Sequence, residues 1–254
     1  MKARHPAHLP DRQIALPNLL QRTHDRTVTT TLNPFDDPQH VARYADRAAQ
    51  MVPAYRDIHR MVAVLIAERA PSDARILVLG AGGGLETKAF AEAHQGWTFD
   101  AVDPSAAMLD LAERNLGPLA KRVRMHHGFV DDAPAGPFAA ATSLLTLHFL
   151  PYEERRATAT QVRRRLAPGA PFIVAHMSFP QRDGERELWL SRHVAYLIES
   201  GIDPADVDRA RTAISTQVPV RSPAQDRTIL QEAGFSDVTE FFSAFTFRGW
   251  VGYA

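Results

Sequence analysis

Cysteine is absent from the 254 residues of this chain. A chain without cysteine has no disulfide framework, no thiolate metal ligand and no thiol nucleophile. Lysine is scarce as well, with only Lys2, Lys88 and Lys121, so arginine supplies nearly all the positive charge. Acidic and basic residues balance at 29 each. Binding by phosphate neutralisation needs an excess of basic residues, so we do not expect a nucleic-acid partner.

A long apolar run is also lacking. The most apolar stretch, residues 138–150, is too short and too often interrupted by Thr and His to span a bilayer. The first residues carry charge without an apolar stretch behind them, so we expect no signal peptide. These features predict a cytoplasmic protein that works without a membrane, and they leave a homodimer open. An apolar fraction of 45% is enough for a normal buried core.

Short apolar segments alternate with amphipathic segments from residue 71 onward, which predicts a parallel sheet with helices on both faces. The expected strands span residues 75–79, 98–102, 123–127, 138–145 and 171–176, followed by two closing strands at 238–245 and 247–253. The expected helices span residues 85–93, 104–116, 152–166, 185–215 and 224–233, with two more before the first strand, on either side of Pro53.

One domain at residues 34–254 is expected, after a mobile tail or irregular arm at residues 1–33. The domain divides into a helical cap, a ligand-binding core, a helical insertion, and a closing helix with two strands, at residues 34–70, 71–180, 181–222 and 223–254 respectively.

A glycine-rich turn separates the first expected strand from the next helix, in the run Gly80-Ala81-Gly82-Gly83-Gly84. Glycines here let the backbone approach a ligand that any Cβ would block. Dinucleotide-binding loops place a third glycine where this chain has Leu85. The spacing Gly80-x-Gly82-x-Gly84 is instead typical of methyltransferases. A tight turn without a ligand is the alternative.

A carboxylate ends the second expected strand, where Asp103 stands before Pro104. An acid at this point can accept hydrogen bonds from both ribose hydroxyls of a nucleoside. The same residue could instead cap the following helix. The glycine loop about twenty residues upstream favours ribose binding, with Pro104 beside the nucleoside.

These segments resemble class I S-adenosylmethionine-dependent methyltransferases, and Leu166-Ala167-Pro168-Gly169-Ala170 resembles a further turn of that family. The resemblance covers about residues 73–177. It implies an α/β fold: a doubly wound, seven-stranded, Rossmann-like sheet with N-terminal helices and a helical insertion before the last two strands. It also implies S-adenosylmethionine as cofactor, S-adenosylhomocysteine as product, and methyl transfer to a small or medium-sized acceptor.

Over a longer stretch the chain resembles the carboxy-S-adenosylmethionine synthase and tRNA (cmo5U34)-methyltransferase family. The run Val52-Pro53-Ala54-Tyr55 is similar to that family's entry to the cofactor site, which implies that Tyr55 contacts the cofactor. An ungapped count back from Ala233-Gly234-Phe235 places Arg211 on the family's carboxylate-binding arginine. Carboxy-S-adenosylmethionine synthesis is therefore one alternative function, and a non-catalytic cofactor-binding module is another.

Three positions depart from that family. Val78 stands where the family has an acid, Phe129 where it has the aspartate of Gly-Asp, and Leu144 where it has an asparagine. These changes argue against the synthase activity and leave the cofactor class intact. Leu144 is still expected at the cofactor edge of the sheet.

Two acids could serve the cofactor. Glu86 lies in the first turn after the glycine loop, where it either complements the helix dipole or replaces the missing acid at Val78 and faces the cofactor's ammonium group. Asp131 could accept a hydrogen bond from the adenine amino group while Phe129 and Val130 pack against the ring. Alternatively, Asp131 is an ordinary turn residue.

His148 follows the fourth strand, near the edge where ligands bind in open α/β sheets. It could take a proton from a hydroxyl or amine nucleophile, or it could be a core or helix-capping histidine. No acid or histidine spacing predicts a metal site. The runs Arg155-Arg156 and Arg163-Arg164-Arg165 are expected on a solvated helix face.

Overall fold

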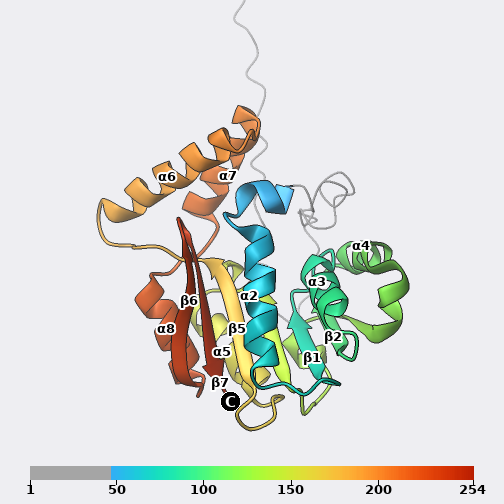
Figure 1. Ribbon diagram of the computed structural model, residues 1–254. Helices are drawn as coiled ribbons and strands as arrows, with labels where there is room; N and C mark the ends of the chain where they lie inside the picture. The colour runs from blue at the N-terminus through green and yellow to red at the C-terminus, as the bar shows by residue number, and fades with distance from the viewer. Residues whose placement is uncertain (1–46) are drawn as a thin grey trace, which may run out of the picture.

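The computed structural model describes residues 47–254, and Figure 1 shows their arrangement. The predicted arm and most of the first predicted helix lie outside these residues. One sheet of seven strands runs through the structure in the order β3-β2-β1-β4-β5-β7-β6. The strands are β1 (Arg75–Leu79), β2 (Thr98–Asp103), β3 (Val123–His127), β4 (Ala140–Leu144), β5 (Pro171–Met177), β6 (Ser236–Ala244) and β7 (Phe247–Tyr253). All neighbouring pairs from β3 to β5 are parallel, and β7 pairs antiparallel with both β5 and β6.

Helices cover both faces of this sheet, as predicted. The longer ones are α2 (Tyr55–Ala67), α3 (Leu85–Ala93), α4 (Ala106–Leu116), α5 (Tyr152–Arg163), α6 (Glu185–Glu199), α7 (Pro204–Thr216) and α8 (Pro223–Glu232). The described residues also contain the short 3-10 helices η2 (Gly117–Arg122), η3 (Val130–Asp132) and η4 (Leu147–Phe149). The fold confirms the predicted doubly wound, seven-stranded α/β sheet.

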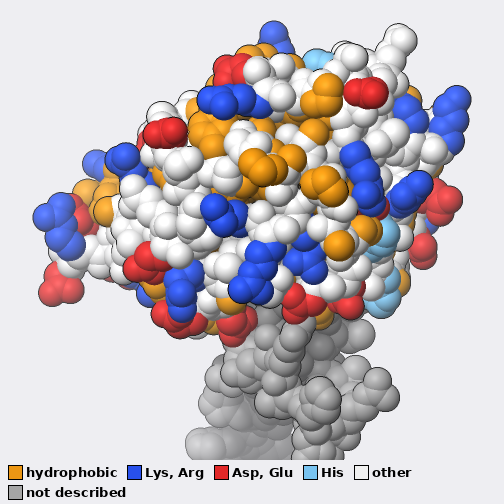
Figure 2. Space-filling model, turned by 90° about the horizontal axis from the view of Figure 1, so that it is seen from below, with side chains coloured by type: hydrophobic (Ala, Val, Ile, Leu, Met, Phe, Trp, Pro, Cys, Tyr) orange, Lys and Arg blue, Asp and Glu red, His pale blue; other side chains and the backbone are white. Residues whose placement is uncertain are grey.

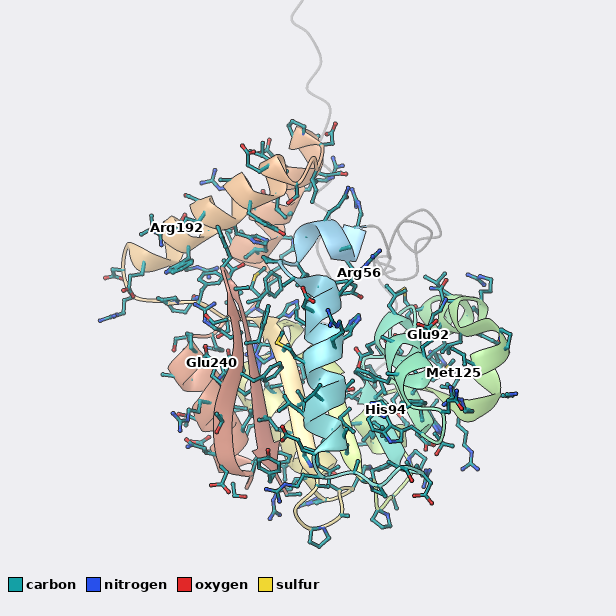
Figure 3. The ribbon with its side chains drawn as sticks, viewed as in Figure 1. Arg56, Glu92, His94, Met125, Arg192 and Glu240 are labelled. Atoms are coloured by element: carbon teal, nitrogen blue, oxygen red, sulfur yellow. The ribbon has the colours of Figure 1, made fainter. Side chains whose placement is uncertain are left out.

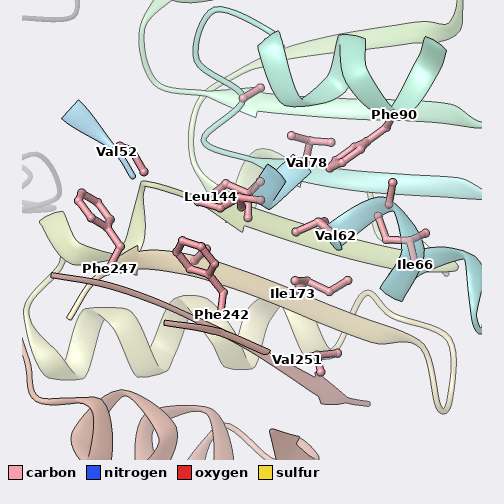
Figure 4. Packing of buried hydrophobic residues seen from close by; sticks show 14 of the residues in the cluster. Val52, Val62, Ile66, Val78, Phe90, Leu144, Ile173, Phe242, Phe247 and Val251 are labelled. Carbon is pink, nitrogen blue, oxygen red and sulfur yellow. The ribbon is translucent and has the colours of Figure 1, made fainter. Parts of the chain in front are cut away.

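The two faces of the sheet have separate hydrophobic cores. One core packs α2 and α3 against alternate residues of the strands, including Val78, Ile173 and Val251 (Figure 4). The other packs α5 and α8 against the intervening residues, such as Leu77 and Val174. Successive strand residues point to opposite faces, so central strands that are apolar throughout bury both sides.

The helical insertion predicted at residues 185–215 consists of two helices rather than one. Gly201 has φ of +79° and lies between the two helices, where the helical conformation of α6 has ended. The side chain of Asp203 then caps α7, whose first residue is Pro204. In Figure 1 both helices lie above the edge of the sheet where the parallel strands end. The ring of Trp189 on α6 lies below two guanidinium groups, with Arg192 (labelled in Figure 3) at 4.7 Å and Arg248 of β7 at 6.0 Å from its centroid.

Two predicted ends shift for local reasons. The helix expected from residue 104 begins at Ala106, because the hydroxyl of Ser105 accepts the amide of Met108 as the helix cap. The fourth strand ends at Leu144, because Leu145 has a left-handed backbone with φ of +58°.

The surface and helices give two further observations. On the face seen from below in Figure 2, basic side chains are interspersed with acidic ones. Within residues 47–254, no helix has the length and apolar character needed to cross a bilayer.

Candidate active site

The glycine loop after β1 is held in place by its protein neighbours. Gly80 has φ of +73°, and a Cβ there would lie 2.1 Å from the Thr146 hydroxyl oxygen. A Cβ on Gly84 would lie 2.9 Å from the Cβ of Ala112 on α4. The Asn115 side chain donates to the Gly83 carbonyl over 2.8 Å. The absence of a Cβ at Gly80 and Gly84 therefore allows close approach of the β4 loop and of α4, in addition to any role toward a ligand.

Asp103 lies at the carboxyl end of β2 and faces this loop. Its carboxylate is buried and accepts the amide of Gly82 over 2.8 Å and the amide of Ser105 over 2.9 Å. Since Ser105 caps α4, the helix-capping alternative for Asp103 is wrong. The carboxylate instead ties the ends of β1 and β2 together, next to an apolar pocket.

This pocket lies at the carboxyl ends of β1, β2 and β4. It is lined by Leu79, Gly80, Val102, Pro104, Gly128, Phe129, Val130, Thr146, Leu147, Phe149, Leu150 and Thr158. The lining is mainly apolar, and Phe129 remains 37% exposed although it is a large hydrophobic residue. An accessible aromatic ring in an apolar pocket fits a planar heterocycle such as adenine.

Among the predicted cofactor contacts, only Gly80, Pro104, Phe129 and Val130 line the pocket, and Asp131 and Leu144 are among those that do not. Asp131 is exposed, and the neighbouring Asp132 holds the turn by accepting the amide of Phe129 over 2.8 Å. Leu144 is buried in the core on the α2 and α3 face. From β4 onward, the pocket is lined by Thr146, Leu147 and Phe149.

Leu145 connects Leu144 to these pocket residues in a strained conformation. A bulky residue with positive φ is a backbone outlier, and such outliers persist where surrounding contacts impose them. Here the Leu145 amide donates to the Ala175 carbonyl over 2.6 Å, and the Thr146 hydroxyl donates to the Leu144 carbonyl over 3.0 Å. The turn thereby directs Thr146 against Gly80.

Glu86 is buried under the glycine loop. The Thr142 hydroxyl on β4 donates to its carboxyl oxygen over 2.7 Å, and Thr142 is the registered neighbour of Val78 on β1. Burial raises the pKa of Glu86 to about 8, although the Thr142 hydrogen bond opposes this shift. The group is therefore mostly neutral near pH 7, so the explanation by a charge complementing the helix dipole does not fit.

Tyr55 begins α2 directly after Ala54, which has a left-handed backbone with φ of 55°. Its half-buried ring meets the ring of His59 edge-on, with 4.6 Å between centroids. His59 in turn lies near Phe90 of α3. Tyr55 thus contacts the α2 and α3 layer, the layer that also contains Glu86.

His148, in η4, is buried between the pocket and the end of β5. Its ring centroid is 6.4 Å from that of His176 on β5. Burial lowers the pKa of His148 well below its ordinary value, with further lowering from His176 and Arg155 and an opposing effect from Asp226. The imidazole is therefore neutral at physiological pH, which is the form that can accept a proton.

Arg155 is buried, so the prediction that it belongs to a solvated face is wrong. It forms an ion pair with Asp226 on α8, and both side chains are 1% exposed. It also donates to the carbonyls of Leu150 and Pro219 over 3.1 and 3.2 Å. The partners are 71 residues apart, so no local pattern could reveal the pair.

Arg211 does not lie in a closed site. Its side chain is exposed on α7, and on the same helix Asp206 pairs with Arg47 and Arg209. This exposure fits a solvated helix residue better than an arginine that points into a roofed site. The ungapped register placed Arg211 on a helix that contributes Val207 and Ile214 to the core, and arginine is abundant along this chain.

Sequence reasoning missed Thr142, Thr146 and Asn115, which contact the loop or the helix after it, and Asp226, which lies near His176. Thr146 and Asn115 act through packing or backbone contacts that depend on the folded chain. Among residues 47–254, no three His, Cys, Asp or Glu side chains are placed to hold a metal ion.

Residues 76–169, which contain the glycine loop, Asp103 and His148, match the family model described as a methyltransferase domain. The chain therefore contains a class I S-adenosylmethionine-dependent methyltransferase domain at these residues. It is 27% identical over 254 residues to the carboxy-S-adenosyl-L-methionine synthase of Stutzerimonas stutzeri, covering 96% of this chain and 98% of that protein. It is 26% identical to the synthase of the same name from Pseudomonas fluorescens Pf-5, covering 82% and 87%.

Solved structures support the same fold for this methyltransferase. An O-methyltransferase family protein from Burkholderia thailandensis superposes with a TM-score of 0.62 at 15% identity, over 86% of this chain and 61% of that one. PigF with SAH superposes with a TM-score of 0.60 at 17% identity, over 87% and 60%. The chain spans about six tenths of each of those chains.

Proposed function

We propose that S-adenosylmethionine binds across the carboxyl ends of β1, β2 and β4. Adenine would occupy the apolar pocket between Pro104 and Phe129, with Val130 beneath the ring. Asp103 would accept hydrogen bonds from the ribose hydroxyls at the carboxyl end of β2, beside the amides of Gly82 and Ser105 that it also accepts. The observation that carries this proposal is that the buried Asp103 accepts the Gly82 amide of the glycine loop, while its chain neighbours Val102 and Pro104 line an apolar pocket with an accessible aromatic ring.

The methionine end of the cofactor would extend from Gly80-Ala81-Gly82 toward the α2 and α3 layer. Glu86 and Tyr55 are the polar side chains that this direction offers. Burial now keeps Glu86 protonated. A cofactor ammonium group next to the carboxyl would lower its pKa, so that Glu86 would ionise on binding. In that role it would supply the acid that is absent at Val78.

The bound cofactor supplies a methyl group already activated on a sulfonium centre. The chain's contribution is to hold the acceptor in line and to exclude water, and such positioning can be worth about 7–11 kcal/mol. His148 would take the proton that a hydroxyl or amine acceptor loses. Its depressed pKa keeps it neutral, the form that can accept a proton, although burial also makes it a weaker base.

A small or medium-sized acceptor fits the placement of α6 and α7 above the carboxyl edge of the sheet. We retain as predictions a cytoplasmic location, a homodimer and the lack of a nucleic-acid partner. Light scattering on the purified chain tests the dimer. Incubation with methyl-labelled cofactor and a metabolite extract tests the acceptor class, because label should appear in a small product.

Carboxy-S-adenosylmethionine synthesis is the second candidate, favoured by the nearly full-length match to the Stutzerimonas stutzeri protein. The exposure of Arg211 and the changed residues Val78, Phe129 and Leu144 favour methyl transfer instead. Mass spectrometry of the nucleotide that copurifies with the protein separates the two. A carboxylated nucleotide would support the synthase, and S-adenosylmethionine or S-adenosylhomocysteine would support the methyltransferase.

A non-catalytic binding module is the third candidate. S-adenosylhomocysteine should raise the melting temperature by mass action, and NAD should not. Binding without labelled product in any extract would favour the module, and no binding at all would contradict the proposed cofactor site.

A further inference from the structure

The apolar pocket at the carboxyl ends of β1, β2 and β4 has little side-chain polarity. Of the described residues that line it, only Thr146 and Thr158 have a polar side chain. The Thr146 hydroxyl donates to the Leu144 carbonyl over 3.0 Å, so its proton is already used. The Thr158 hydroxyl makes no hydrogen bond to any of residues 47–254. Within this lining, Thr158 therefore has the hydroxyl that remains available to a ligand.

Thr158 lies on α5, and a threonine within a helix often bonds its hydroxyl to the carbonyl four residues earlier. Thr160 on the same helix does so, because its hydroxyl donates to the Arg156 carbonyl over 2.9 Å. Thr158 makes no such bond to Glu154, although the spacing is the same. The half-buried Thr158 side chain thus keeps its hydrogen-bonding capacity for solvent or for a molecule in the pocket.

The helix that carries Thr158 is attached to both loops that border the pocket. One turn before Thr158, Arg155 donates to the carbonyl of Leu150 over 3.1 Å, and Leu150 lines the pocket. After the helix ends, Arg165 donates to the Asp131 carbonyl over 3.4 Å, in the turn that follows β3. A side chain on a fixed element binds a ligand at a smaller cost in conformational entropy than one on a free loop.

We propose that Thr158 reads the nucleobase of the cofactor at its exocyclic position. The hydroxyl accepts a hydrogen bond from the amino group of adenine. A hydroxyl also donates, so after rotation it serves an oxo group at the same position. The pocket therefore binds hypoxanthine as well as adenine, and it discriminates against a purine that has only hydrogen there. This inference rests on the proposed placement of the cofactor.

Asp131 is the competing candidate for the same contact. It is exposed, and it is not among the residues that line the pocket. An ionised carboxylate can only accept hydrogen bonds, so it would bind the amino group of adenine and disfavour the oxo group of hypoxanthine. The two candidates thus predict different base preferences.

The test is calorimetric titration of the full chain with three ligands. They are S-adenosylhomocysteine, S-inosylhomocysteine, which has an oxo group in place of the amino group, and the analogue with hydrogen at that position. The wild type should bind the first two about equally and the third about two- to tenfold more weakly, as expected for one neutral hydrogen bond. Equal binding of all three, or marked exclusion of S-inosylhomocysteine, would overturn the proposal.

Thr158→Val removes the hydroxyl and keeps the shape of the side chain. It should weaken the adenine and hypoxanthine ligands to the affinity of the hydrogen analogue, which should itself bind as in the wild type. Thr158→Ser keeps the hydroxyl and should keep the wild-type order of affinities. Thr160→Val is the matched control, because the Thr160 hydroxyl is bonded to its own helix. A preference for S-adenosylhomocysteine over the hydrogen analogue that persists in Thr158→Val would overturn the proposal.

The comparison between ligands also separates this inference from the proposed function. Failure of the wild type to bind S-adenosylhomocysteine would contradict the cofactor site and the role of Thr158 together. Binding of S-adenosylhomocysteine with the same affinity in the wild type and in Thr158→Val would contradict the role of Thr158 alone. The ratio of two affinities in one sample does not depend on the fraction of folded protein, so partial misfolding of a variant leaves the result readable.

Discussion

The two halves of the sheet stabilise their functional groups in different ways. In the half built on β1, β2 and β3, the proposed ribose acceptor is held by backbone groups, since Asp103 accepts the amides of Gly82 and Ser105. In the half built on β5, β7 and α8, side chains far apart in sequence meet in a buried cluster, as Arg155 and Asp226 do.

This difference has an energetic consequence. Asp103 is proposed to bind the ribose, so loss of its side chain should affect binding most. In a buried ion pair, removal of one partner leaves the other charge buried and unpaired, which lowers the stability of the fold. We therefore expect substitutions in the cofactor half to change affinity, and substitutions in the cluster to change stability.

The largest expected effect is that of Asp226→Asn. It leaves the Arg155 guanidinium buried without a carboxylate, which should lower the free energy of unfolding by about 3–5 kcal/mol. Urea denaturation measures this loss. Replacing both partners, Arg155→Met with Asp226→Leu, should be far milder, since two apolar groups leave no charge unpaired. Equal losses in the single and double variants would break the contrast between the two halves.

Asp103→Ala should act mainly on binding. Loss of the charged ribose acceptor should weaken S-adenosylhomocysteine by about 1.5–3 kcal/mol, the range for hydrogen bonds to charged groups. Calorimetry measures the affinity, and the melting temperature without ligand shows how much the lost Gly82 and Ser105 contacts contribute. Asp110→Ala, at an exposed position on α4, is the matched control. An unchanged affinity in Asp103→Ala would refute the ribose assignment.

The same contrast explains what could be predicted from the sequence. The strands around the glycine loop and Asp103 follow from short-range periodicity, and residues 75–79, 85–93 and 123–127 have the predicted bounds. Asp103 could be located because its function depends on a strand end and a nearby loop. The partnership of Arg155 with Asp226 could not, since it depends on how α5 and α8 meet across the folded chain. Arg211 shows the opposite error: its position in the sequence matches that of the family's arginine, but its side chain is exposed to solvent.

Glu86→Gln tests the buried acid of the cofactor half. Its pKa of about 8 exceeds the ordinary 4.5, so the folded state keeps a proton that the unfolded state releases between these values. Wild-type stability should therefore fall as pH rises through this window, by at most about 1.4 kcal/mol per pH unit, and Glu86→Gln should flatten the slope. Urea unfolding at several pH values between these two pKa values measures the slope of the free energy of unfolding against pH.

Glu92→Gln, exposed on the same helix and labelled in Figure 3, should leave that slope in place. The proposed role toward the cofactor adds a second readout. Binding of S-adenosylhomocysteine near neutral pH should release a proton in the wild type but not in Glu86→Gln, which calorimetry in two buffers of different ionisation enthalpy detects. Proton release that persists in Glu86→Gln would assign it to another group.

The smallest expected effect is that of Arg211→Ala. Arg211 is exposed on α7, and exposed substitutions away from specific contacts usually change stability by less than about 0.5 kcal/mol. Neither S-adenosylhomocysteine affinity nor the free energy of unfolding should change, because no ligand carboxylate is held in a closed site by this side chain. Competition between S-adenosylhomocysteine and a carboxylated cofactor analogue sharpens the measurement. A selective loss of the carboxylated analogue in Arg211→Ala, with recovery only partial in Arg211→Lys, would show that a bidentate guanidinium does bind a carboxylate there. That result would favour a carboxylated ligand, as in the synthases that the chain resembles along its length.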